Sequence, residues 1–303
     1  MNRKKRRLLL CLAALAFAVC LAGTVDSLLE KRQARLDHEQ SLLLAGLPSL
    51  TLPATVPPTE EVGQTAPSES REPTSTLPQT APPVQAPEET VPATAPIVTL
   101  TDPMAEALKS TDIAALQRKN QDVVGWILIP GTSVSYPLMR GTDNAYYLKH
   151  TWLKEKSSAG SVYMDYRCAP TLEEFNTIVY GHHLKDGSMF SPLRQYREQA
   201  FGEAHPSVYV ITQTEVKRYD VFAAYDTQVD DTHSYRLGLK EEAGKQAYIN
   251  YCLNHSVYST GLTPLPTDRL LTLSTCPKGT GNDYKTRLVV HAVLTYETDI
   301  QAQ

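Results

Sequence analysis

Apolar and polar residues alternate along most of the chain beyond residue 120, a pattern typical of β-strands with one buried face. Eight stretches show either this alternation or a short β-branched, apolar run, and turn residues separate them. These stretches are residues 123–129, 135–139, 160–166, 176–180, 207–212, 215–225, 271–276 and 287–294. Many short strands with turns between them predict a mainly β fold, an eight-stranded closed or nearly closed β-barrel.

Helical patterns precede and interrupt this β-rich region. Residues 102–119 have apolar positions at helical spacing and predict one or two N-terminal helices. Residues 240–254 form the one long helical stretch between predicted strands, so a crossover helix is expected there. Residues 26–46 are also helical in pattern, with leucines at heptad spacing at positions 29, 36 and 43. Three heptad positions are too few for a coiled coil, so a solvated juxtamembrane helix is the preferred interpretation.

The N-terminus has the pattern of a membrane anchor. Residues 1–7 include five basic side chains, and residues 8–25 follow without a charge, which is the lower length limit for a spanning helix. The basic tail is expected to stay in the cytoplasm and the rest of the chain to lie outside the plasma membrane, on the cell-wall side. A cleaved signal peptide is the alternative, but the small-x-small pattern at residues 16–18 lies inside the apolar run.

Composition divides the remainder of the chain. Residues 47–97 are rich in Pro, Thr, Ala and Glu and nearly free of aromatic residues, so a disordered, extended linker is predicted. Residues 98–303 contain all the predicted strands and are expected to form one folded domain with a sizeable core. The linker is therefore expected to hold this domain away from the membrane.

Charge and cysteine content narrow the function classes. The net charge is −4 and the isoelectric point about 6.1, so nothing indicates a nucleic-acid partner. Two of the five cysteines lie in the N-terminal apolar run. The others, Cys168, Cys252 and Cys276, are too few and too scattered for a disulfide framework or a zinc cluster, and no cofactor or metal is expected. Cys168 and Cys252 remain open between buried thiols and a disulfide.

Three side chains suggest nucleophilic chemistry. Cys276 ends one predicted strand, and Arg287 begins the next only eleven positions later. A thiol beside a guanidinium favours thiolate, and the guanidinium can hold a developing oxyanion. His182, in Tyr-Gly-His-His at the end of another strand, can transfer protons near neutral pH. Buried structural roles remain the alternative for a lone cysteine or histidine, and adjacent His182 and His183 point to opposite faces, which disfavours a shared metal ion.

Seven stretches of the chain, taken in order, resemble the class B sortases of Gram-positive bacteria. The similarity extends over about residues 116–294, and Arg287 stands at the position expected from it. The similar stretches are residues 120–127, 129–132, 143–148, 159–166, 180–182, 187–190 and 272–276. The resemblance implies a sortase-type β-barrel with N-terminal helices and one long crossover helix.

The resemblance also implies an activity. Sortases are membrane-anchored cysteine transpeptidases, of the thiol protease class of hydrolases, that cleave a C-terminal sorting signal of a secreted protein after Thr. They pass through a thioacyl-enzyme and transfer the acyl group to an amine, either of a peptidoglycan precursor (lipid II) or of a pilin lysine. Class B members often take signals of the Asn-Pro-x-Thr type. No cofactor or metal is implied.

By position, the resemblance assigns residue roles. Cys276 is the expected nucleophile, His182 the general acid and base, and Arg287 the group that binds the substrate carbonyl or oxyanion. Specificity is expected in residues 227–239 and the helix after them. The residues expected to bind substrate are Asn144, Leu148, Tyr180, Ser274 and Thr275.

Other interpretations stay open. One is a secreted cysteine protease that mainly hydrolyses, although papain-like enzymes place cysteine before histidine and this chain has the reverse order. Another is a non-catalytic cell-wall scaffold module. The linker segments Leu-Pro-Ala-Thr at 52–55 and Leu-Pro-Gln-Thr at 77–80 look like sorting signals. Compositional bias explains them as chance matches, and recognition by the chain's own active site is the alternative.

Overall fold

The computed structural model describes residues 3–47, 101–276 and 285–300, without the side chains of residues 3–22, 27 and 276. Almost all of the predicted linker at 47–97 lies outside these residues, as does the turn predicted after Cys276. The described residues 3–47, 102–276 and 285–300 belong to one compact unit.

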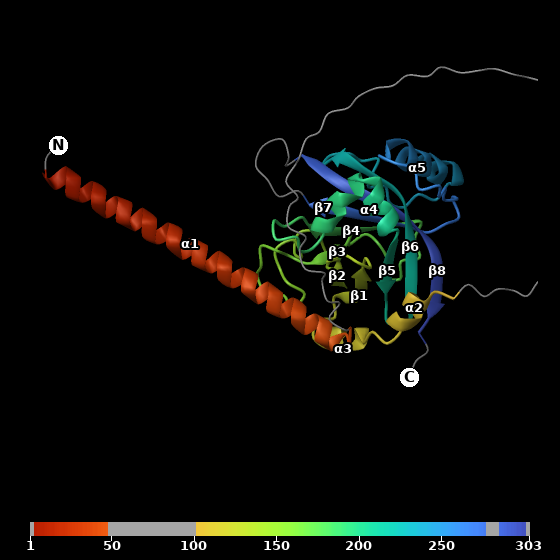
Figure 1. Ribbon diagram of the computed structural model, residues 1–303, viewed down its shortest axis with the longest axis horizontal. Coiled ribbons are helices and arrows are strands. Elements are labelled where there is room, and N and C mark those ends of the chain that lie inside the picture. The colour runs from red at the N-terminus through yellow and green to blue at the C-terminus, as the bar shows by residue number, and fades with distance from the viewer. Residues whose placement is uncertain (1–2, 48–100, 277–284, 301–303) are drawn as a thin grey trace, which may run out of the picture. The chain divides into compact units, whose positions relative to one another are not determined.

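Eight strands of the described residues close into a single barrel, as the alternating pattern predicted (Figure 1). The neighbour order is β1-β2-β3-β4-β7-β8-β6-β5. Two neighbouring pairs, β2 with β3 and β4 with β7, are parallel, and the other pairs are antiparallel. The strands are β1 (Val123–Leu128), β2 (Ser135–Met139), β3 (Val162–Met164), β4 (Asn176–His182), β5 (Ser207–Ile211), β6 (Glu215–Gln228), β7 (Leu270–Cys276) and β8 (Thr286–Asp299).

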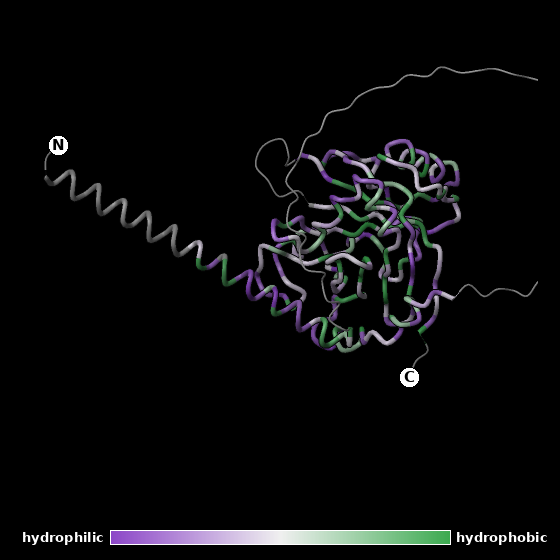
Figure 2. Tube along the Cα trace, in the orientation of Figure 1, coloured by the Kyte–Doolittle hydropathy of each residue, from purple (hydrophilic) through white to green (hydrophobic). Residues whose placement is uncertain are grey.

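The barrel interior is filled by side chains from every strand, and apolar stretches follow the strands in Figure 2. Ile127 of β1 points into this core, whereas its neighbours Trp126 and Leu128 belong to a second cluster outside the barrel wall. Residues of the short N-terminal helices, such as Leu116, cover that outer face. Both faces of β1 are therefore buried, which explains its nearly continuous apolar sequence.

The helical stretch predicted at residues 102–119 forms two short helices, α2 (Pro103–Leu108) and α3 (Ile113–Gln117). Each begins at an aspartate cap: Asp102 accepts from the Met104 and Ala105 amides, and Asp112 from the Ala115 amide. The crossover helix α5 (Glu242–His255) connects β6 to β7, close to its predicted bounds. A 3₁₀ helix, η1 (Ser191–Arg197), and α4 (Gln199–Ala204) were not predicted, because segments this short carry little periodicity.

Helix α1 (Arg3–Leu44) includes the backbone of both predicted N-terminal segments, 8–25 and most of 26–46. Among the described residues, no helix has both the length and the apolar character that crossing a membrane requires. The side chains of residues 8–22, which make up most of the predicted anchor, lie outside the description.

The C-terminal part of α1 packs against the barrel, so the expectation of a purely solvated helix is incomplete. The leucines at 29, 36 and 43 are exposed, as a solvated face requires. Asp37 and Ala45, in contrast, are buried. The Trp152 indole donates a 2.7 Å hydrogen bond to the Asp37 carbonyl, and the rings of His38 and Tyr136 lie 4.5 Å apart. These contacts are long-range, and heptad spacing within the helix does not report them.

Candidate active site

Strands β4 and β7 place the predicted histidine and cysteine side by side. The two strands pair in parallel, and the register sets the Cα of His182 opposite that of Cys276. The same register pairs Tyr180 with Ser274. The side chain of Cys276 lies outside the described residues, so its backbone position is what the structure supplies.

Arg287 comes from the strand on the other side of β7. In the antiparallel pair of β7 and β8, Ser274 lies opposite Val289. Cys276 is two residues beyond Ser274, and Arg287 is two residues before Val289. The cysteine thus ends the middle strand of three, between the strands that carry His182 and Arg287.

His182 and Arg287 line one pocket of about 710 Å³, here called the groove. Three of the predicted substrate-binding residues, Asn144, Leu148 and Tyr180, line the same groove. Pockets of this size hold small ligands or a few residues of a peptide. The remaining lining residues are Glu30, Lys149, Lys156, Ser157, Ser158, Tyr163, Val229 and Tyr235.

The His182 ring is oriented by a backbone carbonyl. Its Nε2 lies 2.8 Å from the Leu148 carbonyl oxygen. Because a carbonyl oxygen only accepts, Nε2 carries hydrogen in this arrangement. Nδ1 is then the ring nitrogen that can exchange a proton with a reacting group. Leu148 thus contributes twice to the site: its carbonyl orients His182, and the residue lines the groove.

Asp165 is a site residue that the sequence reasoning missed. Its buried carboxylate accepts hydrogen bonds from Asn144 Nδ2 at 2.9 Å and from the Tyr180 hydroxyl at 3.1 Å. Arg167 forms a bidentate pair with the same carboxylate, at 2.9 and 2.8 Å. Burial raises the pKa of Asp165, but the hydrogen bonds from Arg167 and Asn144 outweigh it, and the pKa lies below its ordinary value. An ionised Asp165 therefore holds two groove residues in place.

The two predicted residues just before Cys276 occupy different surroundings. Ser274 is fully buried, and its hydroxyl lies 3.0 Å from that of Tyr235, a groove residue. Thr275 is buried as well, and its hydroxyl accepts from the Leu288 amide at 3.1 Å. Neither residue lines the groove; Ser274 reaches it through Tyr235, and the side chain of Thr275 bonds to β8.

The loop between β6 and α5, where specificity is expected, contributes Val229 and Tyr235 to the groove. Asp231 organises this loop. It accepts from the Thr227 hydroxyl at 2.6 Å, from the Ser234 hydroxyl, and from the His233 amide at 2.8 Å. Burial raises the pKa of Asp231, but these hydrogen bonds outweigh it and lower the pKa. These charge-assisted bonds tie Thr227, His233 and Ser234 to one ionised carboxylate.

Cys168 and Cys252 do not have the surroundings of a reactive thiol. Cys168 and Cys252 are both buried and free, which answers the open question about a disulfide between them. Burial raises the pKa of each thiol to about 12. A protonated, buried thiol is a poor nucleophile. His182 is also distinct from its neighbour His183, which does not line the groove.

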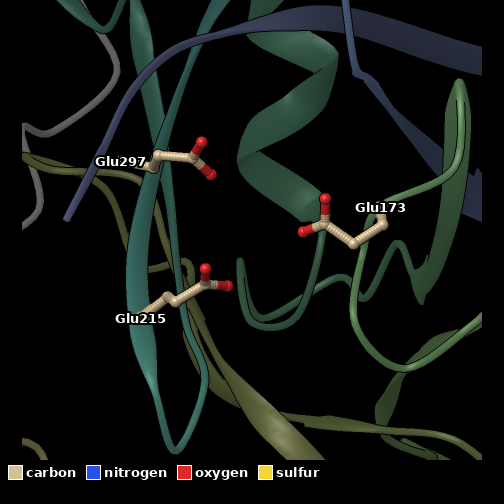
Figure 3. A group of neighbouring side chains, drawn as sticks. All are labelled: Glu173, Glu215 and Glu297. Carbon is tan, nitrogen blue, oxygen red and sulfur yellow. The ribbon is translucent and has the colours of Figure 1, made fainter. Parts of the chain in front are cut away.

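Among the described residues, three carboxylates lie close enough together to suggest a metal site: Glu173, Glu215 and Glu297 (Figure 3). The ammonium of Lys217 already lies among them, at 3.1, 2.8 and 3.0 Å respectively. Arg269 binds Glu173 at 2.6 Å and also pairs with Glu297. These five residues, here called the lysine cluster, satisfy the carboxylates with cationic side chains, so we assign no metal to them.

Comparison with known proteins agrees with this arrangement. Residues 127–295 match the model of the Sortase domain family. The chain belongs to the sortase family. The sortase B of Listeria monocytogenes is 37% identical over 184 residues, which cover 60% of this chain and 74% of that protein. The sortase B of Staphylococcus aureus is 32% identical over 180 residues, covering 59% and 73% respectively.

Solved structures support the class as well as the family. The Staphylococcus aureus sortase B–substrate complex has a TM-score of 0.57 at 32% identity and covers 60% of this chain and 84% of that one. Sortase B from Listeria monocytogenes has a TM-score of 0.54 at 36% identity, covering 59% and 98%. This sortase is therefore of class B, with the eight-stranded barrel of that class. The family identifies it as a cysteine transpeptidase.

Proposed function

We propose that this sortase cleaves a C-terminal sorting signal after a threonine and transfers the new acyl group to an amine. The observation that supports this most is the strand register, which brings His182 and Cys276 together, with Arg287 on the next strand. Both His182 and Arg287 line a groove of peptide-binding size. A relative of known structure is a sortase B–substrate complex, which fits binding of a peptide in this groove.

In the proposed mechanism, the Cys276 thiolate attacks the threonine carbonyl carbon of the signal. The Arg287 guanidinium stabilises the oxyanion by charge-assisted hydrogen bonds. His182 then protonates the departing amine, and the C–N bond breaks to leave a thioacyl-enzyme. In the second half, an incoming amine attacks the thioester, the C–S bond breaks, and His182 takes the proton that the amine loses.

The groove residues would bind the signal. Asn144 and Tyr180 present polar groups that Asp165 holds in place, and Leu148 provides an apolar contact. Ser274 would act through its bond to the Tyr235 hydroxyl, and Thr275 through its bond to the Leu288 amide of β8, rather than as groove walls. Apolar groove walls would also slow loss of the thioester to water.

The same proposal includes a location and an acceptor. Residues 1–7 and 8–25 have the charge and length of a single-pass anchor with its N-terminus inside, which would place the catalytic domain on the cell-wall side of the plasma membrane. The acceptor there would be an amine of a peptidoglycan precursor such as lipid II, or of a pilin. One solved sortase B is complexed with triglycine, which is consistent with an amine acceptor.

A direct test uses the purified full-length chain, a library of sorting-signal peptides and triglycine as the amine. Mass spectrometry should detect an acyl adduct on Cys276, cleavage after threonine and a ligated triglycine product. The Cys276→Ala variant should give none of these. Cleavage without ligated product at saturating triglycine would identify a protease instead, and no adduct with any peptide would reject the proposed function.

A further inference from the structure

A second pocket of about 340 Å³ lies between helix α1 and the barrel, and no step described so far uses it. We call it the helix pocket. Its lining combines residues of α1, Tyr136 of β2, a segment at 158–159 and the loop that follows β4. These residues are Lys31, Ala34, Arg35, His38, Tyr136, Ser158, Ala159, Leu184, Lys185, Asp186, Ser188 and Met189.

The wall that α1 contributes is held in place. The Trp152 indole bonds to the Asp37 carbonyl at 2.7 Å, one residue from His38 in the pocket wall. The His38 ring lies 4.5 Å from that of Tyr136, on the barrel side of the pocket. Past the helix end, the Asp112 amide bonds to the Ala45 carbonyl at 3.0 Å. The pocket is thus a built feature of the folded unit.

The charges of the helix pocket favour an anion. Lys31, Arg35 and Lys185 contribute three positive charges, and Asp186 contributes one negative charge, so the lining carries a formal +2. Burial raises the pKa of Asp186, but hydrogen bonds from Ser188 and the charges of Arg35 and Lys31 lower it overall. Asp186 is therefore ionised and opposes only part of the positive charge.

One ring nitrogen in the helix pocket lacks a partner. Among the described residues, Nδ1 of His38 is buried and has no hydrogen-bond partner. Burial lowers the pKa of His38 to about 4, so the ring is neutral near pH 7. A neutral imidazole nitrogen offers a ligand one donor or one acceptor. Beside it, Leu184, Met189 and Tyr136 give the pocket an apolar floor.

The helix pocket adjoins the groove. Ser158 lines both, and the neighbouring helix residues Glu30 and Lys31 line the groove and the helix pocket respectively. Leu184, in the pocket wall, follows His182 by two residues. We propose that the helix pocket binds the acceptor substrate: an amine whose anionic group lies against Lys31, Arg35 and His38 while its amino end reaches the groove past Ser158.

This inference rests on the proposed function, because it concerns the second half of the reaction. The ammonium of the acceptor would first lie near the Glu30 carboxylate, which lines the groove, and would lose one proton to solvent to give the neutral amine. On transfer, the amine nitrogen forms a C–N bond to the acyl carbon and the C–S bond breaks. The neutral amine loses one further proton to His182, and the Cys276 sulfur leaves as the thiolate, which restores the thiolate and the protonated imidazole with which the first half began.

The test compares two acceptors that differ by one charge, triglycine and triglycinamide, with the full-length chain and one fixed sorting peptide. In the wild-type protein, the KM for triglycine should be about tenfold lower than that for triglycinamide, because only triglycine has a carboxylate. The K31E/R35E variant should lose this preference. Both positions are exposed, so folding should be retained, as a thermal scan would check.

The matched control is Arg32→Glu, an exposed charge reversal on the same helix that does not line the helix pocket. It should keep the preference for triglycine. In all variants, acyl-enzyme formation and its slow hydrolysis should be unchanged, since neither needs the acceptor.

Two outcomes would overturn the inference while leaving the proposed function intact: an unchanged preference in K31E/R35E, or an equal loss in the Arg32→Glu control. A fall in the rate of acyl-enzyme formation in K31E/R35E alone would assign the helix pocket to the sorting signal instead, and the acceptor site would be rejected. Failure of the proposed function itself would be recognised separately, as the absence of any acyl adduct in the wild-type protein.

Discussion

The two ends of strands β6 and β8 use cationic side chains in opposite ways. At one end, Lys217 pairs with Glu297 in the strand register and lies fully buried among three carboxylates. At the other end, Thr227 pairs with Arg287, whose side chain lines the groove. Ten residues of β6, about 30 Å of strand, separate the two.

The difference separates stability from chemistry. In the lysine cluster, carboxylates compensate the charge of Lys217, and the cluster lines neither of the two pockets beside the proposed catalytic residues. In the groove, His182 and Arg287 border open volume that a substrate can enter. A residue change in the lysine cluster should therefore lower the stability and leave the reaction rate unchanged. A change at the groove end should lower the reaction rate and leave the stability unchanged.

The largest effect is expected at the groove end. Arg287→Lys keeps the charge but removes the planar fork, so acyl-enzyme formation should slow by roughly 100- to 1000-fold. The thermal midpoint should stay within a degree or two of the wild-type value. Single-turnover kinetics with a sorting peptide measures the first, and calorimetry the second. Arg118→Lys, at an exposed position, is the control and should change neither. A normal rate in Arg287→Lys would contradict the proposed role.

The reverse result is expected at the other end. Lys217→Met leaves three carboxylates without their central cation and should lower the free energy of unfolding by about 2 kcal/mol. The loss stays below that of a fully buried pair because the carboxylates are partly exposed. Denaturant unfolding gives the change, with exposed Lys240→Met as the control. A lower kcat in the folded variant would break the separation of the two ends.

Asp165→Asn tests a positioning role within the groove. The amide cannot accept all the bonds that Asp165 now receives from Asn144, Tyr180 and Arg167, so the groove residues should loosen. The KM for the sorting peptide should rise by about fivefold to tenfold, with kcat within twofold. Steady-state kinetics separates the two constants, and exposed Asp230→Asn should change neither. A fall in kcat alone would assign Asp165 a different role.

The smallest effect concerns acid pH. Burial raises the pKa of Glu297, but hydrogen bonds from Lys217 and Arg269 outweigh it and lower the pKa below its ordinary 4.5. When folding lowers the pKa of a carboxyl group, the resulting stabilisation is complete at pH values above the pKa of the unfolded chain. It is lost as the pH falls through the lower pKa of the folded protein. The thermal midpoint should therefore decline between about pH 5 and pH 3, and less steeply in Lys217→Met. Equal slopes in the two proteins would contradict this.

The fold was largely predictable because its signals are local. Alternation or a short β-branched, apolar run located all eight strands, and turn residues separated them. The packing of α1 was not predictable in this way, since the hydrogen bond between Trp152 and Asp37 joins residues far apart in the sequence. The short segments η1 and α4 were missed for a different reason, because one or two turns of helix leave little periodicity to detect.

The candidate site was predictable in its types of residue and less so in their contacts. Cys276, His182 and Arg287 stand at strand ends, where polar residues interrupt an apolar pattern. Asp165 also follows a strand, but nothing local distinguishes it from a surface acid, and only its bonds to Asn144 and Tyr180 reveal it. Thr275 shows the opposite error. Its place beside the cysteine suggested a substrate-binding residue, but its side chain is bonded to β8.

The parallel pairing of β4 with β7 also bears on how the enzyme comes to be active. β5, β6 and α5 all lie between these two strands in the sequence, so the partners must find each other across a long stretch of chain. Such distant contacts close late and slowly when a protein folds. The thiol and the imidazole therefore come together only through this long-range pairing, so the reactivity depends on the completed sheet rather than on any local segment.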